Sequence, residues 1–288
     1  MQLLRGKPFW KSPEIVFMKA FLFAAVLLIA LSTVFLAACA TVPPSSLQNN
    51  VQDSAWQGRK KLRAWTVYSD RCRISRKLFL EIGKSLNYYI TADDDEKILY
   101  LIFEDTHSFA DAIHDIAFVT KSYEHGSKKI KAHGGFVKVW HSGSEQVMKE
   151  FFEQLEKYPD YEIVFVGWSM GGAIAHLAAE EFNFRTRTDE ANPDSGRKVV
   201  LITYGCPNLL YGKDMRDYFE RCVKAAYNFA NIKDPFAKLP PVAWNFFVIR
   251  RIEVGQNYKG KKHPHLSYGQ KEIYKDIVID EPYVQVSE

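Results

Sequence analysis

Residues 162–173 read Glu-Ile-Val-Phe-Val-Gly-Trp-Ser-Met-Gly-Gly-Ala, an apolar run that breaks at Gly-x-Ser-x-Gly and continues into an Ala-rich stretch. The run favours a buried strand, and the stretch after it keeps an apolar face at helical spacing. A serine on so tight a turn needs small neighbours, which Gly167 and Gly171 supply. The pattern predicts a nucleophile elbow with Ser169 at its tip, the alternative being an ordinary strand-to-helix turn.

The N-terminal segment indicates where such a serine would act. Residues 20–40 contain no charged side chain and follow Lys19, as in a signal peptide with a basic start and an apolar centre. An uncleaved transmembrane anchor, which needs about 20 apolar residues, is the alternative. The sequence Leu-Ala-Ala-Cys at 36–39 resembles the bacterial lipoprotein signal, in which the cysteine is lipidated and becomes the mature N-terminus.

This resemblance divides the chain into three parts. Residues 1–38 are the expected signal peptide, in which 1–17 precede a second start at Met18. Residues 39–54 are expected to form a tether lipidated at Cys39, and residues 55–288 a single catalytic domain. Ala40 rather than Asp follows the cysteine, which by the bacterial sorting pattern implies an outer-membrane location in the cell envelope.

The chain after residue 38 has the size and charge of one α/β domain. Its 250 residues, 288 minus 38, are enough for a sizeable core. It keeps 34 basic and 33 acidic side chains, so the formal charge falls from +4 to +1 and nothing indicates nucleic-acid binding. Cys72, Cys206 and Cys222 lack metal-type spacing; a Cys206–Cys222 disulfide and three buried thiols are equally compatible with it. No metal or cofactor is expected.

A serine nucleophile needs a base and a carboxylate that orients the base. In a strand-elbow-helix fold of this kind the expected order along the chain is Ser, Asp, His. Residues 199–204 and 223–229 are predicted buried strands, and Asp234 lies in the loop after the second, before Pro235. We therefore predict Asp234 as the acid. The competing carboxylates are two in an expected surface helix and one after every candidate histidine: Asp214, Asp217 and Asp280.

Three histidines follow Ser169. His176 lies two turns into the expected helix and is predicted to be a packed or surface residue. His263 precedes a proline and is expected to be a loop residue. His265 begins a His-x-x-Tyr pattern in which Tyr268 could pack under the imidazole, so His265 is the predicted base.

In ordered blocks, the chain resembles the class 3 lipase family of α/β-hydrolases, which includes fungal triacylglycerol lipases, over roughly residues 95–270. The blocks are Leu-Tyr-Leu-Ile-Phe-Glu-Asp-Thr at 99–106, Ala-His-Gly-Gly-Phe at 132–136, the elbow, Thr-Tyr-Gly-Cys-Pro-Asn at 203–208, the Asp234 loop with Leu-Pro-Pro at 239–241, and the His-x-x-Tyr at 265–268. The resemblance implies an α/β-hydrolase fold, a central and mostly parallel sheet flanked by helices. It implies Ser169, Asp234 and His265 as the triad.

The same resemblance implies an oxyanion hole formed by the backbone N–H of Met170 together with Thr106. Just before Thr106, Glu104 and Asp105 replace the family's usual Arg and Gly and make this strand end acidic and stiffer. The His-Gly-Gly at 133–135 is a rival oxyanion loop of the His-Gly-Gly-Gly esterase type, but it lacks the third glycine. Trp168 stands where the family commonly has a histidine, and its bulk is expected either to shape the pocket or to fill the core.

A helical face follows Thr106. Phe109, Ile113 and Ile116 are spaced i, i+4 and i+7, where the family has its mobile lid, so this face is expected to be a lid or an acyl-pocket wall, with an ordinary core helix as the alternative. Residues 55–97 are expected to form one or two covering helices, and residues 118–132, around Gly126, a β-hairpin.

These features together predict a membrane-tethered serine ester hydrolase that cleaves lipid carboxylic esters through an acyl-enzyme. The alternative function is that of a non-catalytic, hydrolase-like envelope lipoprotein that serves as a binding or assembly module. The acidic pair at 104–105 motivates this alternative.

Overall fold

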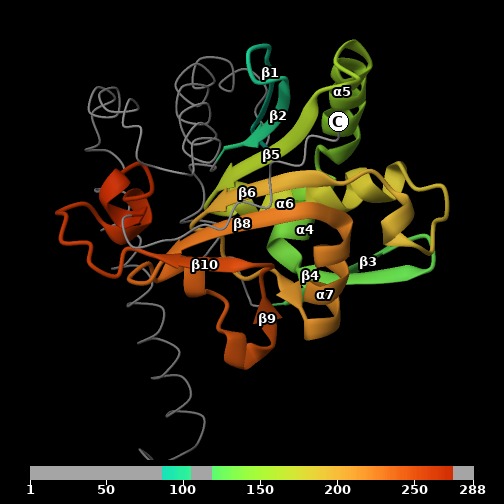
Figure 1. Cartoon of the computed structure of the whole chain (residues 1–288). Coiled ribbons are helices and arrows are strands. Elements are labelled where there is room, and N and C mark those ends of the chain that lie inside the picture. The colour runs from blue at the N-terminus through green and yellow to red at the C-terminus, as the bar shows by residue number, and fades with distance from the viewer. Residues whose placement is uncertain (1–85, 105–118, 275–288) are drawn as a thin grey trace, which may run out of the picture. The chain divides into compact units, whose positions relative to one another are not determined.

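The computed structural model describes residues 86–104 and 119–274 (Figure 1). All of them belong to the larger of the two units into which the chain divides, residues 45–288. The predicted signal, tether and lid lie outside the described residues, as do Cys39, Cys72, Asp105, Thr106 and Asp280. Within the described ranges, no helix combines the length and apolar character of a membrane span, and no group of three or more potential ligand side chains could hold a metal ion.

A six-stranded sheet forms the centre of the described domain (Figure 1). In spatial order its strands are β1 (Tyr88–Asp93), β2 (Ile98–Phe103), β5 (Glu162–Trp168), β6 (Val199–Tyr204), β8 (Val223–Asn231) and β10 (Arg251–Val254). Only the β1–β2 pair is antiparallel, and the other four pairs are parallel. The predicted mostly parallel sheet is therefore confirmed.

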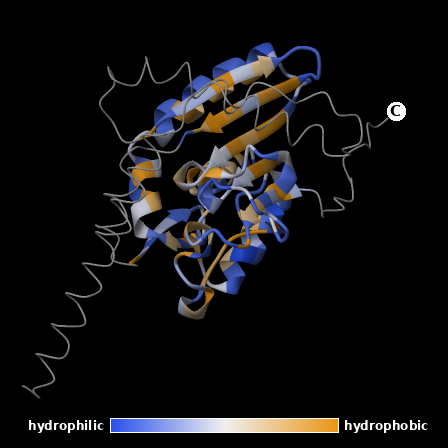
Figure 2. Ribbon diagram, turned by 90° about the vertical axis from the view of Figure 1, so that its left-hand side faces the viewer, coloured by the Kyte–Doolittle hydropathy of each residue, from blue (hydrophilic) through white to orange (hydrophobic). Residues whose placement is uncertain are grey.

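The central strands are buried on both faces. Every residue of β2 and of β6 is buried, which explains why their sequences are nearly continuous apolar runs rather than alternating ones. Figure 2 shows hydrophobic residues along strands in the interior of the domain. One face of the sheet carries a core cluster that includes Ile102, Val166 and Tyr204.

Within residues 86–104 and 119–274, four α-helices accompany the sheet: α4 (Gly134–His141), α5 (Ser144–Lys157), α6 (Met170–Arg185) and α7 (Lys213–Cys222). Helix α6 is buried continuously from Met170 to Asn183, because it packs on the sheet and is itself covered by α4 and α7. Its approach to β2 is close: a Cβ at Gly171 would lie 2.4 Å from the carbonyl oxygen of Phe103. Asp214 and Asp217 are exposed on α7, as predicted.

A second, four-stranded sheet is built on the predicted hairpin. Strands β3 (Thr120–His125) and β4 (Lys128–His133) are antiparallel, and β7 (Leu210–Tyr211) and β9 (Phe246–Phe247) extend them. Short 3-10 helices connect other elements: η3 (Pro193–Ser195), η4 (Phe236–Lys238), η5 (Val242–Trp244), η6 (Pro264–Leu266) and η7 (Lys271–Tyr274).

The prediction of covering helices up to residue 97 is wrong in its last part, because residues 88–93 form β1. This segment reads Tyr-Tyr-Ile-Thr-Ala-Asp, and its aromatic and β-branched residues favour a strand. The pairing of its six residues with β2 fixes that choice, although the charged residues before it favoured a helix.

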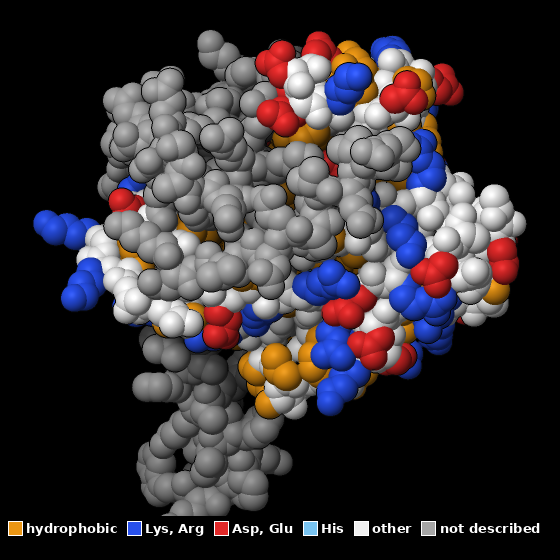
Figure 3. Space-filling view, viewed as in Figure 1, with side chains coloured by type: hydrophobic (Ala, Val, Ile, Leu, Met, Phe, Trp, Pro, Cys, Tyr) orange, Lys and Arg blue, Asp and Glu red, His pale blue; other side chains and the backbone are white. Residues whose placement is uncertain are grey.

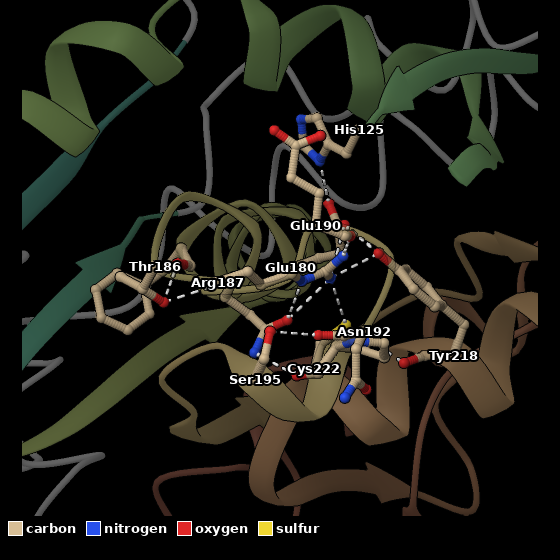
Figure 4. Close-up of polar contacts among 12 residues, drawn as sticks. His125, Glu180, Thr186, Arg187, Glu190, Asn192, Ser195, Tyr218 and Cys222 are labelled. Carbon is tan, nitrogen blue, oxygen red and sulfur yellow. Dashed lines mark hydrogen bonds and ion pairs between the residues drawn. The ribbon is translucent and has the colours of Figure 1, made fainter. Parts of the chain in front are cut away.

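A buried polar network joins the hairpin to α6 and α7 (Figure 4). The carboxylate of Glu180 is fully buried and lies 2.8 Å from both the Nδ1 atom of His125 and the hydroxyl of Tyr218. The guanidinium of Arg187, whose side chain is only 1% exposed, donates to Tyr218 at 2.7 Å and lies 3.9 Å from Glu180. The negative charge of Glu180 is thus balanced inside the protein rather than by solvent.

The two described cysteines are both buried and free. Cys222 belongs to the polar network, with its Sγ atom 3.7 Å from a guanidinium nitrogen of Arg187, and burial raises the pKa of its thiol to about 12. Cys206 lies beside α6, 3.8 Å from the imidazole of His176. Of the two expectations, the Cys206–Cys222 disulfide is therefore wrong.

Basic and acidic side chains are interspersed on the described part of the face in Figure 3. Oppositely charged side chains also pair at the surface, as in Arg216–Asp217 and Arg221–Asp194. The pattern agrees with the near-zero formal charge of the chain after residue 38.

Candidate active site

Ser169 forms the turn between β5 and α6. The strand ends at Trp168 and the helix begins at Met170, and Ser169 between them has φ 55° and ψ −125°. A residue with a side chain rarely adopts this backbone conformation, which is typical of the strained nucleophile elbow. A Cβ at Gly167 would lie 2.2 Å from the carbonyl oxygen of Gly171, so the turn can close only with glycine there.

The structure brings Ser169, His265 and Asp234 into one hydrogen-bonded chain. The Nε2 atom of His265 lies 2.8 Å from the Ser169 hydroxyl oxygen, although the two residues are 96 positions apart. On the other side of the ring, Nδ1 lies 2.7 Å from Oδ2 of Asp234. All three residues are fully buried. The serine therefore has a base in contact, and the base has a carboxylate that orients it.

Asp234 is held by donors on both of its oxygens. The backbone N–H groups of Phe236 and Ala237 donate to Oδ1 at 2.9 and 3.4 Å, and the Tyr268 hydroxyl donates to Oδ2 at 2.6 Å. Burial alone would raise the pKa of this carboxyl, but His265 and the donated hydrogen bonds outweigh it and hold the pKa below its usual value. Asp234 is thus ionised at neutral pH.

Tyr268 does more than the sequence predicted. Its ring lies next to the imidazole of His265 but stands edge-on to it, with centroids 6.3 Å apart. Its hydroxyl also donates to Asp234 and accepts from the backbone N–H of Asn231 at 2.9 Å, which ties the acid to the end of β8. The His-x-x-Tyr spacing located this tyrosine but gave no signal of its contact with the acid.

Two further aromatic rings pack on His265. The indole N–H of Trp168 donates to the backbone carbonyl of His265 at 3.2 Å, and the two rings are 5.3 Å apart. Phe236 places its ring 4.9 Å from the imidazole. Trp168 is partly buried and packs against the core cluster of the sheet, and its contact with the histidine loop also joins the nucleophile strand to the base.

The competing histidines have other roles. His263 accepts the backbone N–H of His265 at its Nδ1 atom and caps the turn η6, which helps to place the base. His176 is buried in α6 with its Nδ1 atom 2.7 Å from the carbonyl of Gly172, and burial lowers its pKa to about 4. The described structure therefore brings His265, and neither competitor, to Ser169.

Of the two expected oxyanion donors, Met170 and Thr106, the first belongs to the described residues. Met170 is the first residue of α6, so its backbone N–H lies at a helix N-terminus, which favours negative charge. Thr106 lies outside the described residues. The rival loop at 133–135 is not available, because its three N–H groups are already engaged. They donate to the carbonyls of Leu209 and Val119 and to the Nδ1 atom of His133.

Comparison with known proteins places this site in a family. The model of the family described as lipase (class 3) matches residues 100–244, which is half of the chain. This chain belongs to the class 3 lipase family. The match includes Ser169 and Asp234 of this class 3 lipase and ends before His265.

Known members resemble this class 3 lipase over part of their length. A lipase of Rhizopus niveus is 33% identical over 135 residues, which are 46% of this chain and 32% of that protein. The solved structure of a propeptide complex of a Rhizomucor miehei lipase deletion mutant is 26% identical with a TM-score of 0.52, over 60% of this chain and 52% of that one. This chain thus spans about a third to a half of these relatives.

One further solved structure is described as a triacylglycerol lipase whose catalytic centre is a serine protease triad. It is 25% identical to this class 3 lipase with a TM-score of 0.52, over 60% of this chain and 63% of that one.

Proposed function

We propose that this class 3 lipase is a serine ester hydrolase that cleaves carboxylic esters of lipids. The observation that carries the proposal is the continuous chain from the Ser169 hydroxyl through both nitrogens of His265 to Asp234, with contacts of 2.8 and 2.7 Å. This series of hydrogen bonds fits proton transfer from the serine during attack on a carbonyl carbon.

The reaction follows from these contacts. His265 accepts the hydroxyl proton as the Ser169 oxygen bonds to the ester carbonyl carbon, and Asp234 stays ionised and stabilises the imidazolium. The oxyanion lies by the N–H of Met170 and, by the family pattern, by Thr106. His265 then returns the proton to the leaving alcohol, and an acyl-enzyme remains. Water attacks it through the same histidine, which releases the fatty acid and restores the serine.

Two observations favour lipid esters as substrates. The relatives of this chain are lipases, and one similar structure is described as a triacylglycerol lipase. The rival function, a non-catalytic binding module, provides no reason for a strained serine that contacts a buried histidine and carboxylate.

The proposal is tested with p-nitrophenyl esters from acetate to palmitate, using the full-length protein beside Ser169→Ala. We expect turnover that depends on Ser169 and favours long acyl chains. Turnover of acetate alone would indicate a small-ester esterase. No turnover of any ester would support the binding module instead.

We also propose that a lipid on Cys39 tethers the protein to the outer membrane, with the lipoprotein-like sequence at 36–39 as support. Two acyl chains are enough for stable anchoring. Wild-type protein and Cys72→Ser should then partition into the detergent phase of a Triton X-114 separation and carry an acyl mass, whereas Cys39→Ser should lack that mass. A wild-type protein without the acyl mass would contradict the tether and favour the uncleaved transmembrane anchor.

A further inference from the structure

Arg251 places a guanidinium against the turn that follows Asp234. It is the first residue of β10, and its Nη2 atom donates to the backbone carbonyl of Ala237 at 2.6 Å and to Oδ1 of Asn208 at 2.9 Å. Both acceptors are neutral, and no carboxylate of the described residues lies within ion-pairing distance of it. A cation in such a position needs a reason, because its removal from water is costly.

The two acceptors of Arg251 hold the segment that orients Asp234. Ala237 lies in η4, and its N–H and that of Phe236 donate to Oδ1 of the acid. Asn208 accepts from Arg251 and holds the end of the same segment. Its side-chain amide donates to the carbonyls of Pro240 and Lys238 at 2.8 and 3.4 Å, and its backbone N–H donates to Leu239 at 2.8 Å.

The charges of Arg251 and Asp234 are opposite in sign. A base must be neutral to accept a proton, so before reaction Asp234 carries a buried negative charge beside an uncharged His265. Burial lowers the pKa of Arg251, and the groups that counter this shift include Asp234. The titratable groups that interact with Arg251 are Cys206, Tyr268, Glu253, Asp234 and His176. Among them, Asp234 is the buried one that is ionised at neutral pH, because Glu253 is exposed.

We propose that Arg251 is a positioning residue of the triad. With Asn208 it fixes residues 236–240 and hence the N–H groups that hold Asp234, and its charge adds to the groups that favour an ionised Asp234. The inference deepens the proposed ester hydrolysis and rests on it.

The test compares Arg251→Met and Arg251→Lys with wild type, in the full-length protein, after Ser169-dependent turnover of the wild type has been established. We expect Arg251→Met to lower kcat about 10- to 100-fold, as for a misplaced catalytic group, with KM within about twofold. The acidic limb of its kcat/KM profile should move to higher pH, because loss of the cation makes protonation of the Asp234–His265 pair easier. Arg251→Lys retains the charge, so its limb should stay near that of wild type.

Two more variants separate position from charge. Asn208→Leu removes the side-chain hydrogen bonds that hold residues 238–240 but leaves the charge of Arg251. It should therefore lower kcat about 3- to 10-fold without moving the acidic limb of the kcat/KM profile. Arg250→Met is the matched control. Arg250 is exposed, and its replacement removes the same charge one residue away in the sequence. It should leave kcat and the limb unchanged.

The outcomes are distinct. Wild-type kcat and pH profile in a folded Arg251→Met would overturn the inference, and so would an equal loss in Arg250→Met. If Arg251→Met does not fold, Asn208→Leu decides the question: wild-type kcat in this variant, when folded, would overturn the inference. Absence of Ser169-dependent turnover in the wild type would overturn the proposed function and this inference with it.

Discussion

Replacement of Asp234 by Asn lowers kcat for ester hydrolysis about 10⁴-fold. Both oxygens of the carboxylate already accept hydrogen bonds, from the Tyr268 hydroxyl and His265 on one side and from backbone N–H groups on the other. The NH2 group of an asparagine would therefore point at a group that itself donates a hydrogen bond. If it faces His265, Nδ1 must accept rather than donate, and Nε2 then carries the proton and cannot accept the one from the serine. Steady-state kinetics with a p-nitrophenyl ester measure the effect.

The matched control is Asp214→Asn, because Asp214 is one of the three competing carboxylates and is exposed on α7. It should retain wild-type kcat. Far-UV and near-UV circular dichroism of Asp234→Asn should match the wild type, which separates lost chemistry from lost fold. A kcat for Asp234→Asn within tenfold of the wild type would show that Asp234 does not orient the base.

Arg187→Met destabilises the fold by about 3–5 kcal/mol, because it leaves the buried Glu180 carboxylate without its nearest permanent cation. Tyr218 loses a hydrogen-bond donor in the same variant. The midpoint of urea unfolding, followed by tryptophan fluorescence, reports the change. Arg216→Met removes a cation from an exposed pair and should cost no more than about 1 kcal/mol. Equal costs for the two variants would contradict the account of the network in Figure 4.

The parts of the fold that local sequence determines were predictable. The elbow follows from an apolar strand, two glycines and a helical stretch, all within residues 162–173. Asp234 could be found because it directly follows a buried strand, and His265 because it is in the His-x-x-Tyr pattern. In the structure Asp234 lies just beyond the end of β8, and His265 is beside both Ser169 and Asp234.

The parts that depend on distant pairing were not predictable. Residues 88–93 became a strand because β2 offers an edge to pair with, which the charged sequence before them did not reveal. The contact of Tyr268 with Asp234 requires knowing how residues 34 positions apart are placed. Arg251 reaches the acid loop because β10 pairs in register with β8, opposite Asn228, and nothing in its own neighbourhood in the sequence indicates this.

The departures from the family pattern have different outcomes. Trp168 makes a defined contact with the carbonyl of His265, so replacement of the usual histidine still leaves a donor next to the base. Glu104 is half-buried at the end of β2, where its backbone N–H donates to Asn87. Its neighbour Asp105 lies outside the described residues, so the effect of the acidic pair on the oxyanion hole stays a prediction.

The most direct test of the central claim is the reaction of the full-length protein with a fluorophosphonate probe, followed by mass spectrometry of the labelled peptide. Such probes react with serines that a neighbouring base activates. The account predicts one phosphonylated site, Ser169, in the wild type, and no labelling of Ser169→Ala. An unlabelled wild type, or a probe on another serine, would contradict the assignment of Ser169 as the nucleophile.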